Sequence, residues 1–279
     1  MKMHTHPHAG LRAAACLAAM AVFGVVSIVS AEEKTKGPAG KIFVASVTGE
    51  SQISHGGRLE DMNSKSAYLA EGTIIETKPK ATNALVYSNG TGIFFDSDTR
   101  VEVEKFHQDP FVPNRSDLEV EPSVSQTNVL VVRGAVGLCT SKMVAGSSMT
   151  YRTPLGIVST QGAKLVIETS PDGTTISMLD GESLVRNGQM DIGGKTLHSG
   201  EQAIIKAASG NVPASMVISQ IPPAKRPALD ERIFMACAAR KTVFFDTSGP
   251  QGQGEIKATP VVPVSLPVPV TVSPSQLPP

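Results

Sequence analysis

Tryptophan is absent from this 279-residue chain, and the other aromatic residues are few: three Tyr and nine Phe. Sites that stack bases or sugars on large aromatic platforms are therefore not expected. The interior must be filled mainly by Val, Ile, Leu and Ala, which suits the thin layers of a β protein.

An excess of charge of either sign is also missing, because 25 Lys and Arg balance 25 Asp and Glu. If residues 1–31 are removed on export, Lys2 and Arg12 leave with them, and 23 basic against 25 acidic residues give a formal charge of −2. Neither nucleic acid nor an anionic membrane surface is an expected partner.

Motifs that carry chemistry are lacking as well. There is no G-x-S-x-G elbow, phosphate-binding loop or dinucleotide fingerprint. His55, His107 and His198 stand alone, without cysteines or acids at metal-ligand spacing. The run from Asp96 to Asp98 lacks the Gly and distal Glu of a calcium loop and is typical of a turn. We expect no enzyme, no metal site and no cofactor. A hydrolase with an unfamiliar site is the alternative, which His107 meeting an acid would support.

Residues 1–31 have the three regions of a secretory signal peptide: a short basic start, an apolar run and small residues before the charged Glu32. Cleavage is predicted after Ala31, which places the protein in the periplasm or outside the cell with no membrane insertion afterwards. The alternative is an uncleaved anchor, because the apolar run at 13–31 approaches the about 20 residues that span a bilayer. Residues 32–40 are predicted to be a linker.

Short strands folded into hairpins are predicted for most of the following chain. Residues 41–48 alternate as a first strand, Asn89-Gly90 joins two apolar runs, and residues 128–140 are interpreted as a strand pair interrupted by Gly134 and Gly137. Residues 151–186 hold four turn signals between runs of about five residues; these are Pro154 to Gly156, Gln161-Gly162, Pro171-Asp172-Gly173 and Asp180-Gly181. When the sequence is aligned with itself at a shift of 83 positions, Thr77 falls on Thr160 and Asn89-Gly90-Thr91 falls on Asp172-Gly173-Thr174. An internal repeat of two β halves is therefore one interpretation, and two unrelated hairpins with similar turns are the other.

Residues 41–208 resemble the ferric-citrate regulator (FecR) family of bacterial envelope domains. The resemblance rests on Thr153-Pro154-Leu155-Gly156, Gly162, Asp172-Gly173-Thr174 and Leu179-Asp180-Gly181. It implies a β domain outside the inner membrane, which in family regulators meets an outer-membrane receptor while a cytoplasmic region binds a sigma factor. Here only about a dozen residues precede the apolar run, too few to fold into a sigma-binding unit. A stand-alone exported domain is therefore favoured over a membrane-anchored regulator related to anti-sigma proteins.

The C-terminal part is predicted to add an extended wrap and a helix at 209–246. The wrap includes a possible edge strand at 216–218. The helix, at 227–240, has Pro near its start, acids in its early turns and Arg240 at its end. Its expected apolar stripe consists of Leu229, Ile233, Phe234, Cys237 and Ala238. Eight prolines among residues 247–279 predict a disordered tail.

Cys139 and Cys237 are the two cysteines left after export, so a disulfide between them is one prediction and two separately buried thiols are the other. The segment 107–128 is predicted to be a surface loop and the site of binding. Replacing residues 108–126 by a short linker should then leave stability nearly unchanged and weaken capture of a partner. Core positions are expected at Ile157, Leu165, Ile167 and Ile176.

The sequence as a whole predicts an all-β fold: a compact antiparallel β-sandwich or short β-solenoid built from hairpins, with one C-terminal helix and disordered termini. The predicted function is an exported, non-enzymatic module that binds a protein or an envelope polymer, with a role in cell-envelope signalling.

Overall fold

The computed structural model describes residues 39–113, 119–188, 193–209, 214–248 and 254–261, which belong to one compact unit, Lys36–Pro279. The predicted signal peptide, its cleavage site and the last part of the predicted tail lie outside the described residues. Most of the described residues lie in β-strands and one long helix accompanies them, which confirms the all-β fold class. None of its helices is both long and apolar enough to cross a membrane.

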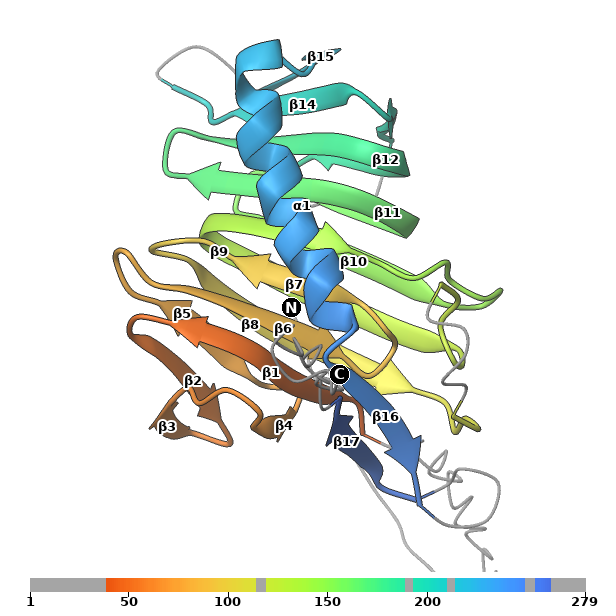
Figure 1. The fold of residues 1–279 in the computed structure, drawn as a ribbon. Coiled ribbons are helices and arrows are strands. Elements are labelled where there is room, and N and C mark those ends of the chain that lie inside the picture. The colour runs from red at the N-terminus through yellow and green to blue at the C-terminus, as the bar shows by residue number, and fades with distance from the viewer. Residues whose placement is uncertain (1–38, 114–118, 189–192, 210–213, 249–253, 262–279) are drawn as a thin grey trace, which may run out of the picture. The chain divides into compact units, whose positions relative to one another are not determined.

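Fifteen strands form one sheet and two more form a separate hairpin (Figure 1). The main path through the sheet is β15-β14-β12-β11-β10-β9-β7-β6-β1-β4, with β13, β2, β3, β5 and β8 attached beside it. In chain order the strands are β1 (Lys41–Thr48), β2 (Ser51–His55), β3 (Arg58–Asp61), β4 (Ala67–Leu69), β5 (Ile74–Thr77), β6 (Thr82–Tyr87), β7 (Gly92–Phe95), β8 (Arg100–Gln108), β9 (Ser125–Cys139), β10 (Ser148–Arg152), β11 (Gly156–Ser170), β12 (Gly173–Asn187), β13 (Lys195–His198), β14 (Glu201–Lys206), β15 (Ser215–Gln220), β16 (Val243–Thr247) and β17 (Ile256–Pro260).

Three strands of 15 residues each, β9, β11 and β12, connect two layers of this sheet. The first half of β9 pairs with β8 and β10, whereas its second half pairs with β7 and β11. β12 likewise pairs with β14 through its first half and with β13 through its second. A strand that changes layers must bend, and glycine supplies the bend. Gly134, Gly162 and Gly181 have φ of 88°, 130° and 88° at these positions.

The structure therefore corrects the prediction of short strands around Gly162 and Gly181. Both glycines lie inside continuous strands that face each other, with Ala163 opposite Gly181 and a register shift beside them. The chain bends there and does not reverse. Residues 128–140 are also not a strand pair, because Gly134 bends the single strand β9. The turns at Asn89-Gly90 and Pro171-Asp172-Gly173 do reverse the chain, as predicted.

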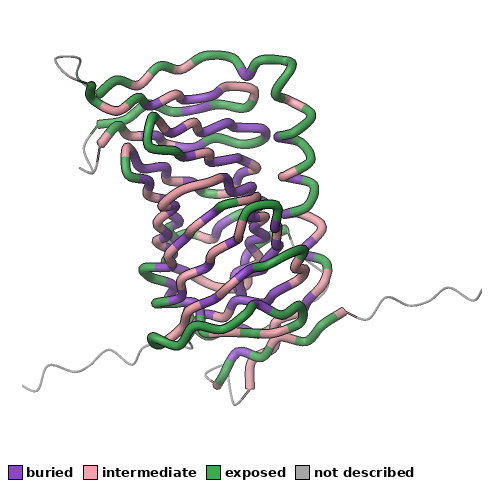
Figure 2. The backbone as a smooth tube through the Cα atoms, turned by 90° about the vertical axis from the view of Figure 1, so that its left-hand side faces the viewer, coloured by how far each residue is buried: buried purple, intermediate pink, exposed green. Residues whose placement is uncertain are grey.

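The main hydrophobic core lies between the two layers and is filled by aliphatic side chains from every long strand. Figure 2 shows the stacked strands with buried residues recurring along each of them. Four positions predicted to be core are buried: Ile157 is 6% exposed, and Leu165, Ile167 and Ile176 are fully covered. Threonine hydroxyls complete the hydrogen bonding beside the bends. Thr99 Oγ1 accepts from the backbone N–H of Ala135 at 3.0 Å, and Thr140 Oγ1 donates to the carbonyl of Ala163 at 3.0 Å.

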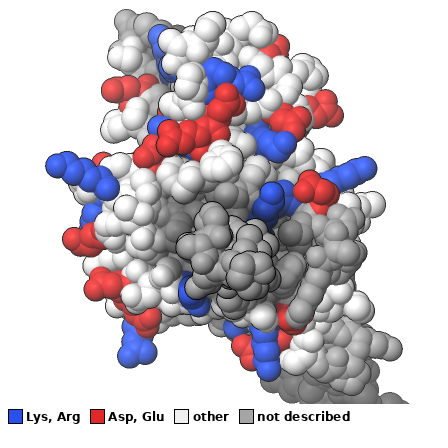
Figure 3. All heavy atoms as spheres, in the orientation of Figure 1, with Lys and Arg blue, Asp and Glu red and all other residues white. Residues whose placement is uncertain are grey.

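Helix α1 (Arg226–Arg240), preceded by a 3-10 turn η1 (Pro223–Lys225), lies across the outer face of one layer (Figure 1). Gly92 and Gly137 allow its close approach, because a Cβ on Gly92 would overlap the carbonyl oxygen of Ala236 and one on Gly137 would lie 2.9 Å from that of Arg232. Lys and Arg lie among Asp and Glu on this face (Figure 3). Arg232 contributes to that pattern by pairing with Asp96 at 2.7 Å and with Glu168 at 3.1 Å.

The helix extends over the residues predicted for it, but its buried stripe differs. Leu229 and Ile233 face the sheet as expected, whereas Phe234 is 69% exposed and Ala236 and Ala239 are buried instead. Close packing on glycines favours small alanines on the contact face, and an aromatic ring would not fit there. Phe234 therefore lies on the outer side of the helix.

Two further boundaries differ from the prediction. The sheet does not end at residue 208, because the possible edge strand at 216–218 is present as β15 and pairs along the whole of β14. Nor is the chain without structure beyond residue 247, because β17 pairs with β16 through Ile256 to Pro260. Pro260 takes the last position of that strand, where a missing backbone donor is tolerated.

Candidate functional site

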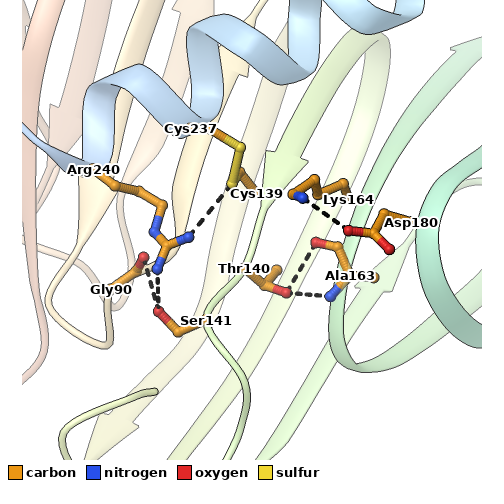
Figure 4. The surroundings of a disulfide bond; sticks show 9 residues. All are labelled: Gly90, Cys139, Thr140, Ser141, Ala163, Lys164, Asp180, Cys237 and Arg240. Atoms are coloured by element: carbon orange, nitrogen blue, oxygen red, sulfur yellow. Dashed lines mark hydrogen bonds and ion pairs between the residues drawn. A yellow bond between two sulfur atoms is a disulfide. The ribbon is translucent and has the colours of Figure 1, made fainter. Parts of the chain in front are cut away.

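The C-terminal turn of α1 is tied to β9 by a disulfide between Cys237 and Cys139 (Figure 4). Their Cα atoms are 5.2 Å apart, and the bond closes a loop of 98 residues. Of the two outcomes that the sequence left open for these cysteines, the structure shows the disulfide and not two separate thiols. Together with Gly92 and Gly137, the bond fixes the end of the helix against the sheet.

Arg240, the last residue of α1, is only 8% exposed. Its guanidinium donates to Ser141 Oγ at 2.9 Å and lies 3.5 Å from Cys139 Sγ, while Ser141 Oγ donates to the carbonyl of Gly90 at 3.3 Å (Figure 4). Burial lowers the pKa of Arg240, and attraction by Glu119 opposes that effect. An arginine remains cationic at neutral pH because its ordinary pKa is so high, so the structure holds a positive charge in a largely dry place.

An apolar pocket of about 270 Å³ opens beside Arg240. Its lining comes from β6 and the β6–β7 turn, from Ser141, from β16 and from two segments of the chain between β8 and β9. The hydrophobic lining consists of Val86, Phe111, Val112, Val120, Pro122, Val243, Phe244 and Phe245, and the remaining lining of Ser88, Gly90, Glu121, Ser141 and Arg240. We call this the Arg240 pocket.

Glu121 is a buried acid in the wall of the Arg240 pocket, with 4% of its surface exposed. Removal from water raises the pKa of Glu121. Hydrogen bonds donated by the Ser147 hydroxyl, by the Val144 N–H at 2.9 Å and by the Ser125 hydroxyl at 3.0 Å act in the opposite direction. This network fixes the wall of the pocket in place.

The segment 107–128 is not the free surface loop predicted from its prolines. Gln108, Phe111 and Ser125 are buried along with Glu121, and Val120 forms a parallel bridge with Lys142. Thr247 of β16 also donates a hydrogen bond to the carbonyl of Phe111 at 2.9 Å. These contacts make the described parts of the segment a wall of the fold, so its replacement should cost stability. Residues 114–118 lie outside the described residues.

Sequence reasoning located one part of the site and missed another. It selected the segment that provides Phe111, Val112 and Val120, and it selected the two cysteines. Arg240 was interpreted only as a favourable charge at the end of a helix, and Glu121 only as part of the surface loop predicted at 107–128. Burial of both follows from contacts between distant segments, which no local pattern shows.

Histidines and metal-binding groups do not contribute to the pocket. Among the described residues, no group of three or more His, Cys, Asp or Glu could hold a metal ion. The Nδ1 of His55 lies 3.1 Å from Thr73 Oγ1, and that of His198 lies 3.8 Å from Glu182 at the surface. His107 lies on β8 opposite Gln126 and does not line the Arg240 pocket.

Comparison with known proteins gives little further guidance. No protein-family profile matches the chain, and no curated protein matches it. Two crystal structures of a Parabacteroides distasonis ATCC 8503 protein, provisionally described as an anti-sigma factor, are similar with 14% identity and a TM-score of 0.40. The similarity covers 56% of this chain and 62% and 63% of those chains. The resemblance of residues 41–208 to the FecR family stays a prediction.

Proposed function

We propose that this protein is an exported, non-enzymatic binding module of the cell envelope, and that the Arg240 pocket receives an apolar anchor from a partner protein. The observation that carries the proposal is the pocket itself, whose lining combines hydrophobic side chains with a buried cation, Arg240. A few anchor residues seated in well-packed pockets of this kind provide most of the affinity in protein interfaces.

The volume of the pocket, about 270 Å³, is enough for one or a few side chains of a protein partner. It lies at the lower end of the about 300–1,000 Å³ that is usual for sites of drug-sized molecules. Val112, 76% exposed, and Val120, 40% exposed, lie at the rim, where they would contact the surface around such an anchor.

The polar groups of the lining add a preference. Arg240 and Ser141 place a positive charge and a hydroxyl beside the apolar side chains. The positive charge of Arg240 would attract an anchor that ends in a carbonyl or carboxylate oxygen, because interactions with a charged donor are stronger than those with a neutral one. We therefore expect a partner segment that is apolar along its length and carries an acceptor at its tip.

Site-specific photocrosslinking in the native envelope tests the proposal. A photoreactive residue at Val112 should give a discrete adduct with one partner, and the same residue at Leu59, 63% exposed on β3, serves as the control. Equal adducts at both positions, or none at Val112, would contradict the proposal. N-terminal sequencing of the exported protein tests its location, with Glu32 expected as the first residue and Met1 as the contrary result.

A further inference from the structure

Strand β15 ends the sheet with one side unpaired among the described residues. Its only partner strand is β14, which runs beside it from Ser215 opposite Lys206 to Gln220 opposite Glu201. Exposed strand edges invite pairing with another chain, and proteins usually protect them with charges, prolines or short length. β15 has the sequence SMVISQ, which contains neither a charge nor a proline.

The other open edges of the same sheet do carry such protection. β3 contains Arg58, Glu60 and Asp61, β4 is only three residues long, and β13 begins with Lys195. The lack of protection at β15 is therefore particular to this strand. Val217, in its centre, is 58% exposed, whereas Met216 and Ile218 turn to the other face and pack against the core.

The backbone groups that face outward follow from one hydrogen bond. The N–H of Ile221 donates to the carbonyl of Gly200 at 2.9 Å, one position beyond the pair of Gln220 and Glu201. In an antiparallel ladder, residues alternate between bonding to the neighbour and facing away. Ser215, Val217 and Ser219 therefore bond to β14, and the peptide groups of Met216, Ile218 and Gln220 point outward.

The sequence of β15 is nearly symmetric about Val217, so two copies of the strand can pair with each other in an antiparallel register centred on this residue. In an antiparallel pair of two copies, Val217 would face Val217, Met216 would face Ile218, and Ser215 would face Ser219. Met216 and Ile218 have the outward peptide groups, so they form the hydrogen-bonded pairs of this register. Val217 then falls in a non-hydrogen-bonded pair, where side chains lie closest, and its exposed surface is covered.

From this self-matching edge we infer that the protein forms a two-fold symmetric dimer, in which β15 of one copy pairs antiparallel with β15 of a second copy through Val217. The sheet then continues from one subunit into the other. The inference does not depend on the Arg240 pocket.

Sedimentation velocity on the exported chain tests this dimer, with variants that introduce a positive or a negative charge at Val217. The mass of the unmodified protein should rise with concentration from that of one chain to that of two. Val217→Lys and Val217→Glu each place like charges directly opposite each other, so each should weaken association about tenfold or more. An equimolar mixture of the two variants should associate again, because unlike charges then meet.

Leu59→Lys is the matched control, since Leu59 is equally exposed but lies on β3, and it should dimerise like the unmodified chain. Both Val217 variants change an exposed side chain, so they should keep the thermal midpoint that the unmodified protein has at a concentration where it is monomeric. A protein that stays monomeric at every concentration overturns the inference and assigns the edge to a different occupant. Dimers that survive both substitutions, a mixture that stays monomeric, or a dimer lost in Leu59→Lys also overturn it.

Discussion

Replacing Cys139 and Cys237 by alanine should lower the free energy of unfolding by about 3 kcal/mol without disrupting the sheet. The bond links α1 to the central strand β9, two elements separated by 98 residues of sequence. Alanine is the appropriate substitute because Cys139 is 1% exposed and alanine adds no polar group at this buried position. A serine there would add the cost of burying a hydroxyl group.

The magnitude follows from the length of the loop. Chain-entropy reasoning gives about 4.7 kcal/mol for a loop of about 100 residues, and measured effects are commonly about 2–4 kcal/mol. For a domain of this size each kcal/mol corresponds to about 2–4 °C, so the thermal midpoint should fall by about 6–12 °C. The helix should stay docked in the folded state, because Arg232 still pairs with Asp96 and Glu168.

Urea denaturation of the unmodified protein and the double-alanine variant, each with and without reductant, separates the bond from other effects. Reductant should destabilise the unmodified protein to the level of the variant and leave the variant unchanged. Thiol titration of unfolded, unreduced protein should find no free thiol in the exported chain. Two free thiols would refute the bond, and a difference below about 0.5 kcal/mol would refute the estimate of its contribution.

Three other predictions concern the helix contact and the pocket wall. Gly92→Ala should destabilise the protein by about 1–3 kcal/mol in thermal unfolding, because its Cβ overlaps the Ala236 carbonyl; an unchanged midpoint would contradict the close helix contact. Glu121→Gln should become more stable relative to the unmodified protein as pH rises from about 4 to about 8. Because the pKa of Glu121 is raised in the folded state, the unmodified protein is most stable while this acid is protonated and loses stability as the acid ionises at higher pH, whereas the Gln variant does not. Urea denaturation in which the difference in stability between the two proteins stays constant or changes in the opposite direction would refute this. Replacing residues 108–126 by a Gly-Ser linker removes Phe111 and Glu121 from buried positions, and it should lower the thermal midpoint clearly; an unchanged midpoint would restore the loop interpretation.

Local signals in the sequence located most elements of the fold. β1 begins and ends where alternation predicts, and Asn89-Gly90 forms the expected hairpin turn, with φ of 86° at Gly90. The same reasoning failed at Gly162 and Gly181, because a glycine indicates an unusual backbone angle without showing whether the chain reverses or only bends. The pairing of two such glycines across neighbouring strands decides that, and pairing is not a local property.

The site was less predictable than the fold. The segment 107–128 and the two cysteines could be selected in advance, since length, proline content and cysteine count are visible in the sequence. The pocket itself needs β16, the end of α1 and the β6–β7 turn to meet. β16 pairs with β17, which lies in a stretch whose prolines predicted disorder. The side chains of Val243 and Ile256 from this hairpin are buried.

The affinity of the purified protein for the partner crosslinked at Val112 tests the central claim most directly. Isothermal titration should show that Val112→Asp weakens binding about tenfold or more, because it places a charge at the rim of an apolar pocket. Leu59→Asp should bind as the unmodified protein does, and both variants should keep its thermal midpoint, because both side chains are exposed. Undiminished binding by Val112→Asp would show that the Arg240 pocket is not the binding site.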